Sequence, residues 1–279
     1  MSGAYAVEFM VSGMNWLTTV GDEDSDRRAR TRARLRAYGR GVWARAKQHG
    51  ARPVCTYMLL VLVGGRAESP VLAAETLKPL IDAGTDEGMW PDDDPAHRVM
   101  TLYAPDPRRL AAGVASIHML VVPVPRSWGG WRALDWLLDT VHAGMGAMRM
   151  LAIGDADWLT SNMRLPQAQR KARQTRVMRQ ARPVWSDGVR LGAQVGVVCA
   201  VSYPDTRYYG DPDNTAETAT ALYGAGVALG AAPPIPRVFA FILDPEQCAG
   251  HTHVMRLLCF AMPQGVDVVD RVVGCAPDV

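Results

Sequence analysis

Lysine and paired cysteines are scarce in this sequence, and long apolar runs are absent. Three of the 30 basic residues are lysine and 27 are arginine. The guanidinium group carries a rigid fork of donors that suits phosphate oxygens, so this bias favours a polyanionic partner. A high-GC codon bias would enrich arginine as well. The net charge is only +2 because acidic residues are gathered elsewhere in the chain, so the location of the charges matters more than their total.

The few cysteines and the short apolar runs exclude several protein classes. The longest apolar runs, 57–63 and 117–124, are far shorter than the roughly 20 residues of a membrane span, so no membrane role is expected. The N-terminus has no charged-then-apolar leader, and the odd set of cysteines contains no C-x-x-C motif, which predicts a reduced, cytoplasmic location. Cys248, His251 and His253 suggest zinc, but no second ligand pair stands at finger-like spacing, so a strand edge with chance polar residues is the favoured interpretation. The cysteines are Cys55, Cys199, Cys248, Cys259 and Cys275.

At 279 residues and 48% hydrophobic content, the chain can bury one large core or two ordinary ones, and it contains an internal repeat. Motif pairs that matched by chance would be separated by different numbers of residues, whereas three repeated motifs are all separated by 142 positions. Asp106-Pro107 and Asp244-Pro245 are 138 positions apart, as a short loop deletion would produce. The pairs at offset 142 are Trp16-Leu17-Thr18 with Trp158-Leu159-Thr160, Val42-Trp43 with Val184-Trp185, and Ala74-Glu75-Thr76 with Ala216-Glu217-Thr218.

Hydrophobic periodicity predicts the same order of elements in both copies: a strand, a basic helix, an apolar strand, a second helix and two closing strands. The expected fold class is therefore α/β (α+β), two tandem two-layer units with a mixed sheet and helices, paired as an intramolecular pseudo-dimer. The predicted ranges are 5–11, 26–47, 54–63 and 73–87 with closing strands ending near 124 in copy one, and 148–153, 167–190, 195–203 and 215–229 with closing strands ending near 262 in copy two.

A connecting segment separates the two copies. Pro123 to Gly130 is rich in proline, glycine and tryptophan, and 131–145 has leucines at helical spacing, which predicts an amphipathic connecting helix. In the first basic helix, Thr31, Leu35, Tyr38 and Val42 predict a buried stripe. The predicted domains are 1–125 for copy one, 126–146 for the connecting helix and 147–279 for copy two.

Each copy contains one acidic cluster. Copy two has Asp211-Pro212-Asp213-Asn214 between an apolar strand and a helix, where two carboxylates can converge on Mg²⁺, although the same residues also make a good turn and helix cap. Copy one has Asp92-Asp93-Asp94 after its second helix, where adjacent carboxylates repel unless a cation is near, and a solvated acidic turn is the alternative. Lys78 lies on the helix between the two positions, and it is either part of a site or a surface lysine.

The repeat register makes these clusters complementary. At an offset of 142, Asp211 and Asp213 fall opposite Ser69 and Val71, and Asp92 to Asp94 fall opposite 234–236, where no acid stands. Lys78 faces Thr220 in the same way. A fused dimer in which each half keeps part of the machinery predicts this pattern, and a turn alone does not.

These motifs resemble the RusA-type Holliday junction resolvases of phages and prophages, small homodimeric endonucleases of DNA recombination and repair. Asp211-Pro212-Asp213-Asn214 is similar to the family's Asp-x-Asp-Asn motif, and Gly88-Met89-Trp90-Pro91-Asp92-Asp93-Asp94 is similar to its second acidic motif. Asn162-Met163-Arg164-Leu165 resembles its Asn-x-Arg-Leu stretch. The two copies cover most of the chain, apart from the connecting helix and the tail after Met262.

The resemblance implies a Mg²⁺-dependent endonuclease for four-way junctions or other branched DNA, in the host cytoplasm if phage-encoded, with one composite site shared by the halves. Mg²⁺ would activate water for attack on the phosphate, and Lys78 would neutralise developing charge. The implied catalytic residues are Asp211, Asp213, Asp92, Asp93 and Lys78; the implied metal ligands are Asp211, Asp213, Asp93 and Asp94; and the implied DNA contacts are Arg27, Arg30, Arg34, Asn162, Arg164, Arg170, Arg173 and Arg176.

The sequence departs from the family in two respects. Neither half has the complete acidic set, and neither Glu75 nor Glu217 matches the family's lysine. Three functions therefore remain open: a nuclease with a composite site, a pseudo-nuclease that binds junction DNA without cutting it, and a phage structural or host-inhibiting protein that reuses the fold. A solvated helix face is the alternative for the arginines.

Overall fold

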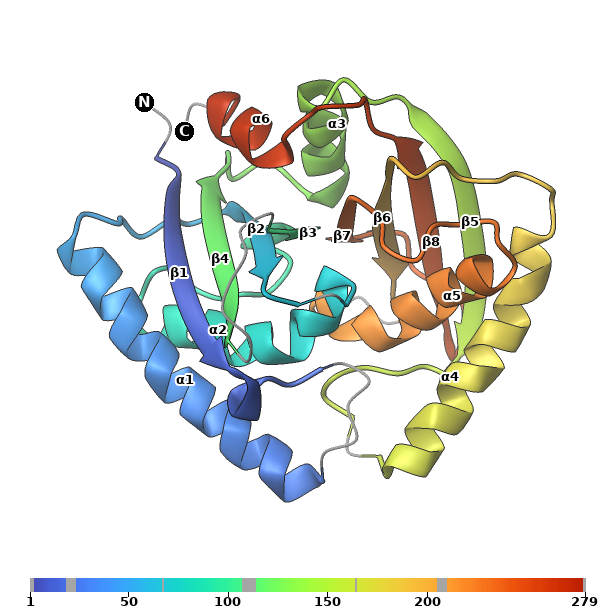
Figure 1. The fold of residues 1–279 in the computed structure, drawn as a ribbon, viewed down its shortest axis with the longest axis horizontal. Coiled ribbons are helices and arrows are strands. Elements are labelled where there is room, and N and C mark those ends of the chain that lie inside the picture. Colours follow the sequence, from blue (N-terminus) through green and yellow to red (C-terminus); the bar gives the residue numbers. More distant parts are fainter. Residues whose placement is uncertain are drawn as a thin grey trace.

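The computed structural model describes residues 3–18, 24–66, 68–106, 114–163, 165–204 and 210–277. This part of the chain forms one eight-stranded mixed sheet with six α-helices, which confirms the predicted mixed sheet with helices packed on it (Figure 1). The strands are β1 (Tyr5–Ser12), β2 (Tyr57–Gly64), β3 (Arg98–Pro105), β4 (Val114–Pro123), β5 (Met145–Gly154), β6 (Val195–Ser202), β7 (Val238–Leu243) and β8 (Thr252–Ala261). The helices are α1 (Ser25–Gln48), α2 (Ala74–Asp86), α3 (Gly130–Thr140), α4 (Gln167–Ala181), α5 (Ala216–Ala228) and α6 (Val268–Gly274).

The order of the strands is the same in both halves of the sheet, read from each outer edge. The order is β1-β4-β2-β3-β7-β6-β8-β5, so β3 and β7 meet at the centre. In each half the outer two pairings are antiparallel and the inner one, β2 with β3 or β6 with β7, is parallel. The central antiparallel pair joins Leu102 to Ala240, 138 positions further on, with Thr101 opposite Phe241 and Tyr103 opposite Phe239. The pattern of strand pairing is therefore the same on either side of the Leu102 and Ala240 pair.

The repeated sequence motifs make the same contacts in each half. Thr76 Oγ1 accepts from Leu17 N at 2.8 Å and donates to Leu17 O at 2.7 Å. Thr218 makes the matching bonds to Leu159 N and O at 3.0 and 2.9 Å. The Trp-Leu-Thr and Ala-Glu-Thr repeats therefore recur because each pair ties the segment after the first strand to the start of the second helix.

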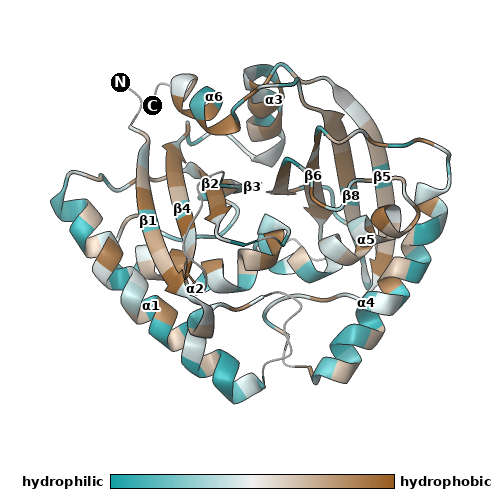
Figure 2. Cartoon of the chain, viewed as in Figure 1, coloured by the Kyte–Doolittle hydropathy of each residue, from teal (hydrophilic) through white to brown (hydrophobic). Residues whose placement is uncertain are grey.

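The helices cover the two faces of the sheet unequally. One face packs against α1, α2, α4 and α5 in a large core, and the other carries a smaller core beneath α3 and α6 (Figure 1). α3 contacts β3 and β7, so it crosses the centre of the sheet. α1 and α4 approach each other at their N-terminal ends and diverge as a V, with many hydrophilic residues along both (Figure 2). Among the described residues, no helix combines the length and apolar character needed to cross a membrane.

The basic helix α1 is built as predicted, with one correction. Asp24 caps its N-terminus by accepting from Arg27 N at 2.7 Å, and Thr31, Leu35 and Val42 are buried. Tyr38 is not part of the buried stripe, because 39% of its surface is exposed.

Two other predicted boundaries are wrong, and one helix was not predicted. The helix predicted over 167–190 ends at Ala181 and continues as a 3-10 turn, Arg182–Trp185, because Pro183 cannot donate a helical hydrogen bond. The connecting helix predicted over 131–145 spans Gly130–Thr140, since the chain turns at His142, whose φ is 53°, and β5 already begins at Met145. The tail after Met262 contains α6, which no pattern predicted.

Candidate functional site

The acidic motif of the second half lies in a 3-10 turn between β6 and α5. The turn spans Pro212–Thr215, with Asp211 as its N-terminal residue. Asn214 Nδ2 donates to Asp211 Oδ2 at 3.1 Å, and Asn214 Oδ1 accepts from Ser161 Oγ at 2.8 Å. The expected turn chemistry is therefore present, yet Asp213 and Asn214 are each only 6% exposed, so this is not a solvated turn.

The acidic motif of the first half lies in the loop between α2 and β3. Gly88, at φ 65°, turns the chain after α2, and Trp90 then fills the space over Gly84, where a Cβ would come within 2.2 Å of the indole ring. This packing fixes the path of the following acidic residues. Asp93 is 8% exposed and points inward, whereas Asp92 is exposed and accepts from the Asp93 amide.

Lys78 joins the two motifs across the halves. Its Nζ donates to Asp93 Oδ2 at 2.5 Å and to Asp211 Oδ2 at 2.8 Å, and it lies 3.2 Å from Asp82 Oδ1. Asp93 and Asp211 are 118 positions apart in the sequence and share one ammonium group. The predicted convergence of carboxylates from opposite halves is thus present in the structure.

Arg98, the first residue of β3, binds Asp213, the third carboxylate at this site. Its Nη1 donates to Asp213 Oδ2 at 2.6 Å and its Nη2 donates to Asp213 Oδ1 at 3.1 Å, a bidentate pair. Nη2 also lies 3.7 Å from Asp93 Oδ2 and 3.8 Å from Asp211 Oδ2. Tyr103 Oη donates to Asp213 Oδ2 at 3.3 Å. We call Lys78, Asp93, Arg98, Asp211 and Asp213 the ion-pair cluster.

The surrounding charges favour the ionised forms of Lys78 and Asp93 but not that of Asp211. Burial alone would lower the pKa of Lys78, but Asp211 and Asp93 outweigh it and raise this pKa above its ordinary value. Burial would raise the pKa of Asp93, but Arg98 and Lys78 lower it. The pKa of Asp211 is raised, because its burial outweighs the attraction of Arg98 and Lys78. Lys78 therefore remains a cation, and it sits among the oxygens that would bind a metal.

The implied Mg²⁺ does not fit the cluster as it is arranged. Mg²⁺ needs oxygens at about 2.0–2.1 Å, and both oxygens of Asp213 already bind the guanidinium of Arg98 while Lys78 Nζ fills the space between Asp93 and Asp211. Across the described ranges, no group of three or more His, Cys, Asp or Glu side chains is placed to hold a metal ion. The same finding applies to Cys248, His251 and His253.

Two of the predicted acidic ligands point elsewhere. Asp94 Oδ1 accepts from the amides of Ala96 and His97 at 3.0 and 3.1 Å and contacts His97 Nδ1 at 2.7 Å, which makes it a turn residue. Asp92 also stays at the turn, bonded to the Asp93 amide. Sequence reasoning missed Arg98, although a charged residue that opens an otherwise apolar strand five positions after Asp93 was an available signal.

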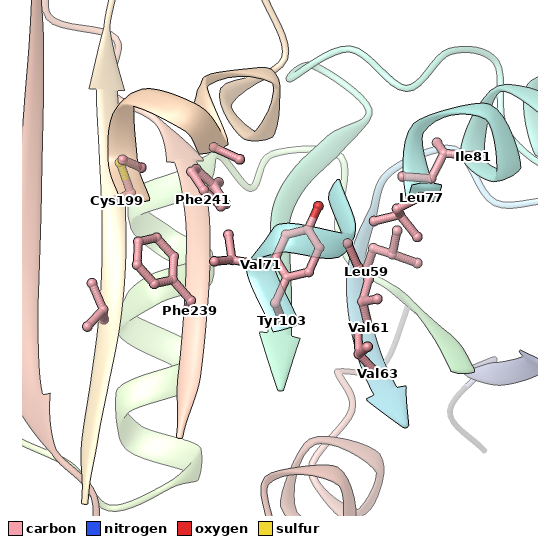
Figure 3. Close-up of a cluster of buried hydrophobic side chains, with 14 of the residues drawn as sticks. Leu59, Val61, Val63, Val71, Leu77, Ile81, Tyr103, Cys199, Phe239 and Phe241 are labelled. Atoms are coloured by element: carbon pink, nitrogen blue, oxygen red, sulfur yellow. The ribbon is translucent and has the colours of Figure 1, made fainter. Parts of the chain in front are cut away.

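The positions equivalent to the ion-pair cluster in the other half carry no charge. By the register of the sheet, Tyr103 corresponds to Phe241, and Arg98 corresponds to Pro236. Val71 occupies the position of Asp213, and Figure 3 shows it between Phe239 and Phe241 on one side and Tyr103 on the other. One site keeps every charge, and its counterpart keeps none of them.

The predicted opposition of Asp92–Asp94 to 234–236 needs correction. The offset between the halves is 142 for α1 with α4 and for α2 with α5, but 138 for β2 with β6, β3 with β7 and β4 with β8, as the sheet register requires. The loop of the second half is therefore four residues shorter than that of the first. It contains no acid, but its residues do not correspond one by one to Asp92–Asp94.

The predicted DNA contacts divide into two groups. Arg27, Arg30, Arg34 and Asn162 are exposed. Arg170, Arg173 and Arg176 are half-buried and turned inward: they bond Glu217, the carbonyls of Asp155 and Trp158, and Asp157, respectively. Arg164 lies outside the described residues.

The exposed basic residues of both helices form rows. On α1, Arg27, Arg30, Arg34 and Arg45 follow the spacing of one helix face. On α4 and the turn after it, the row is Lys171, Arg179 and Arg182, in place of the predicted residues. Within the described residues, none of these seven side chains has an ion pair within 4 Å. We call these the α1 row and the α4 row.

A second buried acidic pair was not predicted as functional. Glu75 and Glu217 occupy the same position of α2 and α5, and each is 1% exposed. Arg32 Nε donates to Glu75 Oε1 at 2.7 Å, and Gln174 Nε2 donates to Glu217 Oε1 at 3.0 Å. Burial raises the pKa of Glu217 to about 7, against the attraction of Arg170 and Arg28 and with the repulsion of Glu75.

Comparison with known proteins gives no family for this chain. A scan against models of known protein families gives no match. A search of curated proteins likewise finds no similar sequence. The assignment of function therefore depends on the geometry of the molecule itself.

Proposed function

We propose that the chain is a tandem duplication of a RusA-like unit, folded as an intramolecular pseudo-dimer, that binds branched DNA without cutting it. The ion-pair cluster carries this proposal. Its carboxylates meet where the resemblance predicts a metal centre, but Lys78 and Arg98 already neutralise them. It thus has the placement of a nuclease site and the bonding of a structural ion-pair network.

The duplication is supported by two independent agreements. The repeated motifs bond through the same atoms in each half, as Thr76 with Leu17 and Thr218 with Leu159. The strand order is also the same from each edge to the central β3 and β7 pair. Two-fold relation about one antiparallel pair is the arrangement expected of a fused symmetric dimer.

DNA binding is supported by the α1 row and the α4 row. α1 has 24 residues and is therefore about 36 Å long, and Arg27, Arg30 and Arg34 are separated by rises of about 4.5 and 6 Å along it. Exposed arginines in such a row can each neutralise one phosphate of a nucleic-acid backbone. Contacts of this kind give affinity that depends on salt and carry little sequence information.

The test is binding of a labelled four-way junction in EDTA over a range of salt concentrations. Three arginines that each neutralise one phosphate contribute about 3 to the slope of log K against log salt, so Arg27→Ala/Arg30→Ala/Arg34→Ala should lower that slope by about this amount. The matched control is Arg36→Ala/Arg40→Ala on the same helix, because these two pair with Asp86 and Glu87. Absence of junction binding at low salt, or equal losses in both variants, would refute the proposal.

A Mg²⁺-dependent endonuclease remains the second candidate, because Asp93 Oδ2 and Asp211 Oδ2 converge on one point from opposite halves. That function requires Lys78 to move away from the carboxylates. Junction DNA incubated with Mg²⁺ should stay intact if the cluster is structural. Nicking by the wild-type protein that disappears in both Asp93→Asn and Asp213→Asn would establish the nuclease in its place.

A further inference from the structure

Lys78 Nζ has the environment of a bound cation. It lies 2.5 Å from Asp93 Oδ2, 2.8 Å from Asp211 Oδ2 and 3.2 Å from Asp82 Oδ1. The side chains of Asp93 and Asp211 are only 11% and 12% exposed, so water has limited access to replace the ammonium. Three acidic oxygens from two halves of the chain thus surround one positive charge.

Lys78 and the acids that surround it are all present at this site, and all of them are absent from the equivalent site formed by the other halves of the repeat. At the equivalent position of the second half stands Thr220, whose hydroxyl donates to Ala216 O within its own helix at 2.7 Å. The first half has Ser69 where the second has Asp211. A lysine that was only a surface residue would not be expected to be present where Asp93 and Asp211 are present and absent where they are absent.

Carboxylate oxygens alone form the donor set around Nζ. Hard divalent ions such as Mg²⁺ and Mn²⁺ prefer this set, at shorter distances than an ammonium group does. Removal of the ammonium would leave two buried carboxylates facing each other, with Arg98 Nη2 at 3.7 and 3.8 Å as the remaining cation close to both. Two carboxylates that contacted one ammonium group lie close together, and like charges so placed in a low-dielectric site favour uptake of a compensating cation or a proton.

We propose that Lys78 Nζ is a built-in cation that takes the place of a divalent metal between Asp93 and Asp211, and that the same position binds Mn²⁺ or Mg²⁺ once the ammonium is removed. This inference rests on the proposed function in one respect, that the wild-type cluster works without a metal. It predicts that a single substitution creates a metal site where the described residues, as they are arranged, form none.

The test is a titration of the full chain with Mn²⁺, in which binding is measured by calorimetry and by electron paramagnetic resonance of the free ion. Lys78→Ala should bind one Mn²⁺ per chain at least ten-fold more tightly than the wild type, and its melting temperature should rise with Mn²⁺. The matched control is Lys47→Ala, which removes an exposed lysine bonded to the Glu87 carbonyl at 3.1 Å and should behave as the wild type. Adding Asp211→Asn to Lys78→Ala should abolish the gained binding.

Folding of the variants is checked by circular dichroism, and Lys78→Gln serves as a second neutral variant of similar length. If either variant unfolds without metal, Mn²⁺ should refold it, and failure to refold would overturn the proposal. Equal Mn²⁺ affinity in the wild type and Lys78→Ala, or no binding by a folded Lys78 variant, would do so as well. Junction binding in EDTA by the wild type is a separate measurement, so a failed titration does not decide the proposed function, nor the reverse.

Discussion

Glu217 is a buried acid whose ionised form is destabilised by the folded protein at neutral pH. It is 1% exposed at the start of α5, beside Arg170, Gln174, Arg28 and Glu75. Burial raises its pKa to about 7 from an ordinary value of 4.5. The folded state therefore binds a proton that the unfolded chain has released between these two values.

The sign and size of the effect follow from linkage. Because the folded protein holds the extra proton, the contribution of Glu217 to stability falls as pH rises from about 4.5 to about 7, and the penalty is complete above that range. A shift of this size corresponds to about 3 kcal/mol of unfolding free energy. Glu217→Gln removes the charge, so we expect it to be more stable than the wild type at pH 8 by up to about 3 kcal/mol and similar to it near pH 5.

The assay is urea unfolding of both proteins at pH 5, 6, 7 and 8. Glu75→Gln is the matched control, because Glu75 occupies the same helix position but pairs with two arginines, Arg32 at 2.5 Å and Arg28 at 3.5 Å, whereas the ion pair described for Glu217 is with Arg170. Loss of the Glu75 charge leaves arginines without their partner and should destabilise the protein at every pH. A Glu217→Gln variant that is less stable than the wild type at pH 8, or whose difference from it does not change with pH, would refute the reasoning.

Two further predictions concern packing. Gly84→Ala should destabilise the protein by about 3 kcal/mol in urea unfolding, because the new Cβ would come within 2.2 Å of the Trp90 ring. Gly224→Ala is the control: its Cβ would meet nothing closer than 3.7 Å, so it should be neutral or stabilising. Equal effects of the two substitutions would contradict the packing described here. Val71→Asp should cost roughly 3–5 kcal/mol in the same assay, because the acid would be buried between Tyr103 and the two rings of Phe239 and Phe241, without the arginine that Asp213 has. A stability equal to that of the wild type would show that the apolar site accepts a charge.

Local sequence patterns predicted most of the secondary structure, because a repeat at a constant offset reports two copies of the same local structure. They also suggested that Asp93 and Asp211 lie together, since each half lacks the acid that the other keeps. Boundaries failed where a single residue decided them, as Pro183 did for the end of α4.

The partners of these acids were decided only by the tertiary structure. Arg98 and Asp213 are separated by 115 positions, and no local period reports that a guanidinium on one strand will face a carboxylate in another half. The arginine faces of α4 were misassigned for a related reason: only Val177 and Ala181 are buried in that helix, and so short an apolar stripe does not fix which basic residues point outward. The sequence by itself determined the repeated elements and the separate acidic motifs. Packing between the two halves of the chain determined which cation each carboxylate contacts, because those contacts form only when distant segments are brought together.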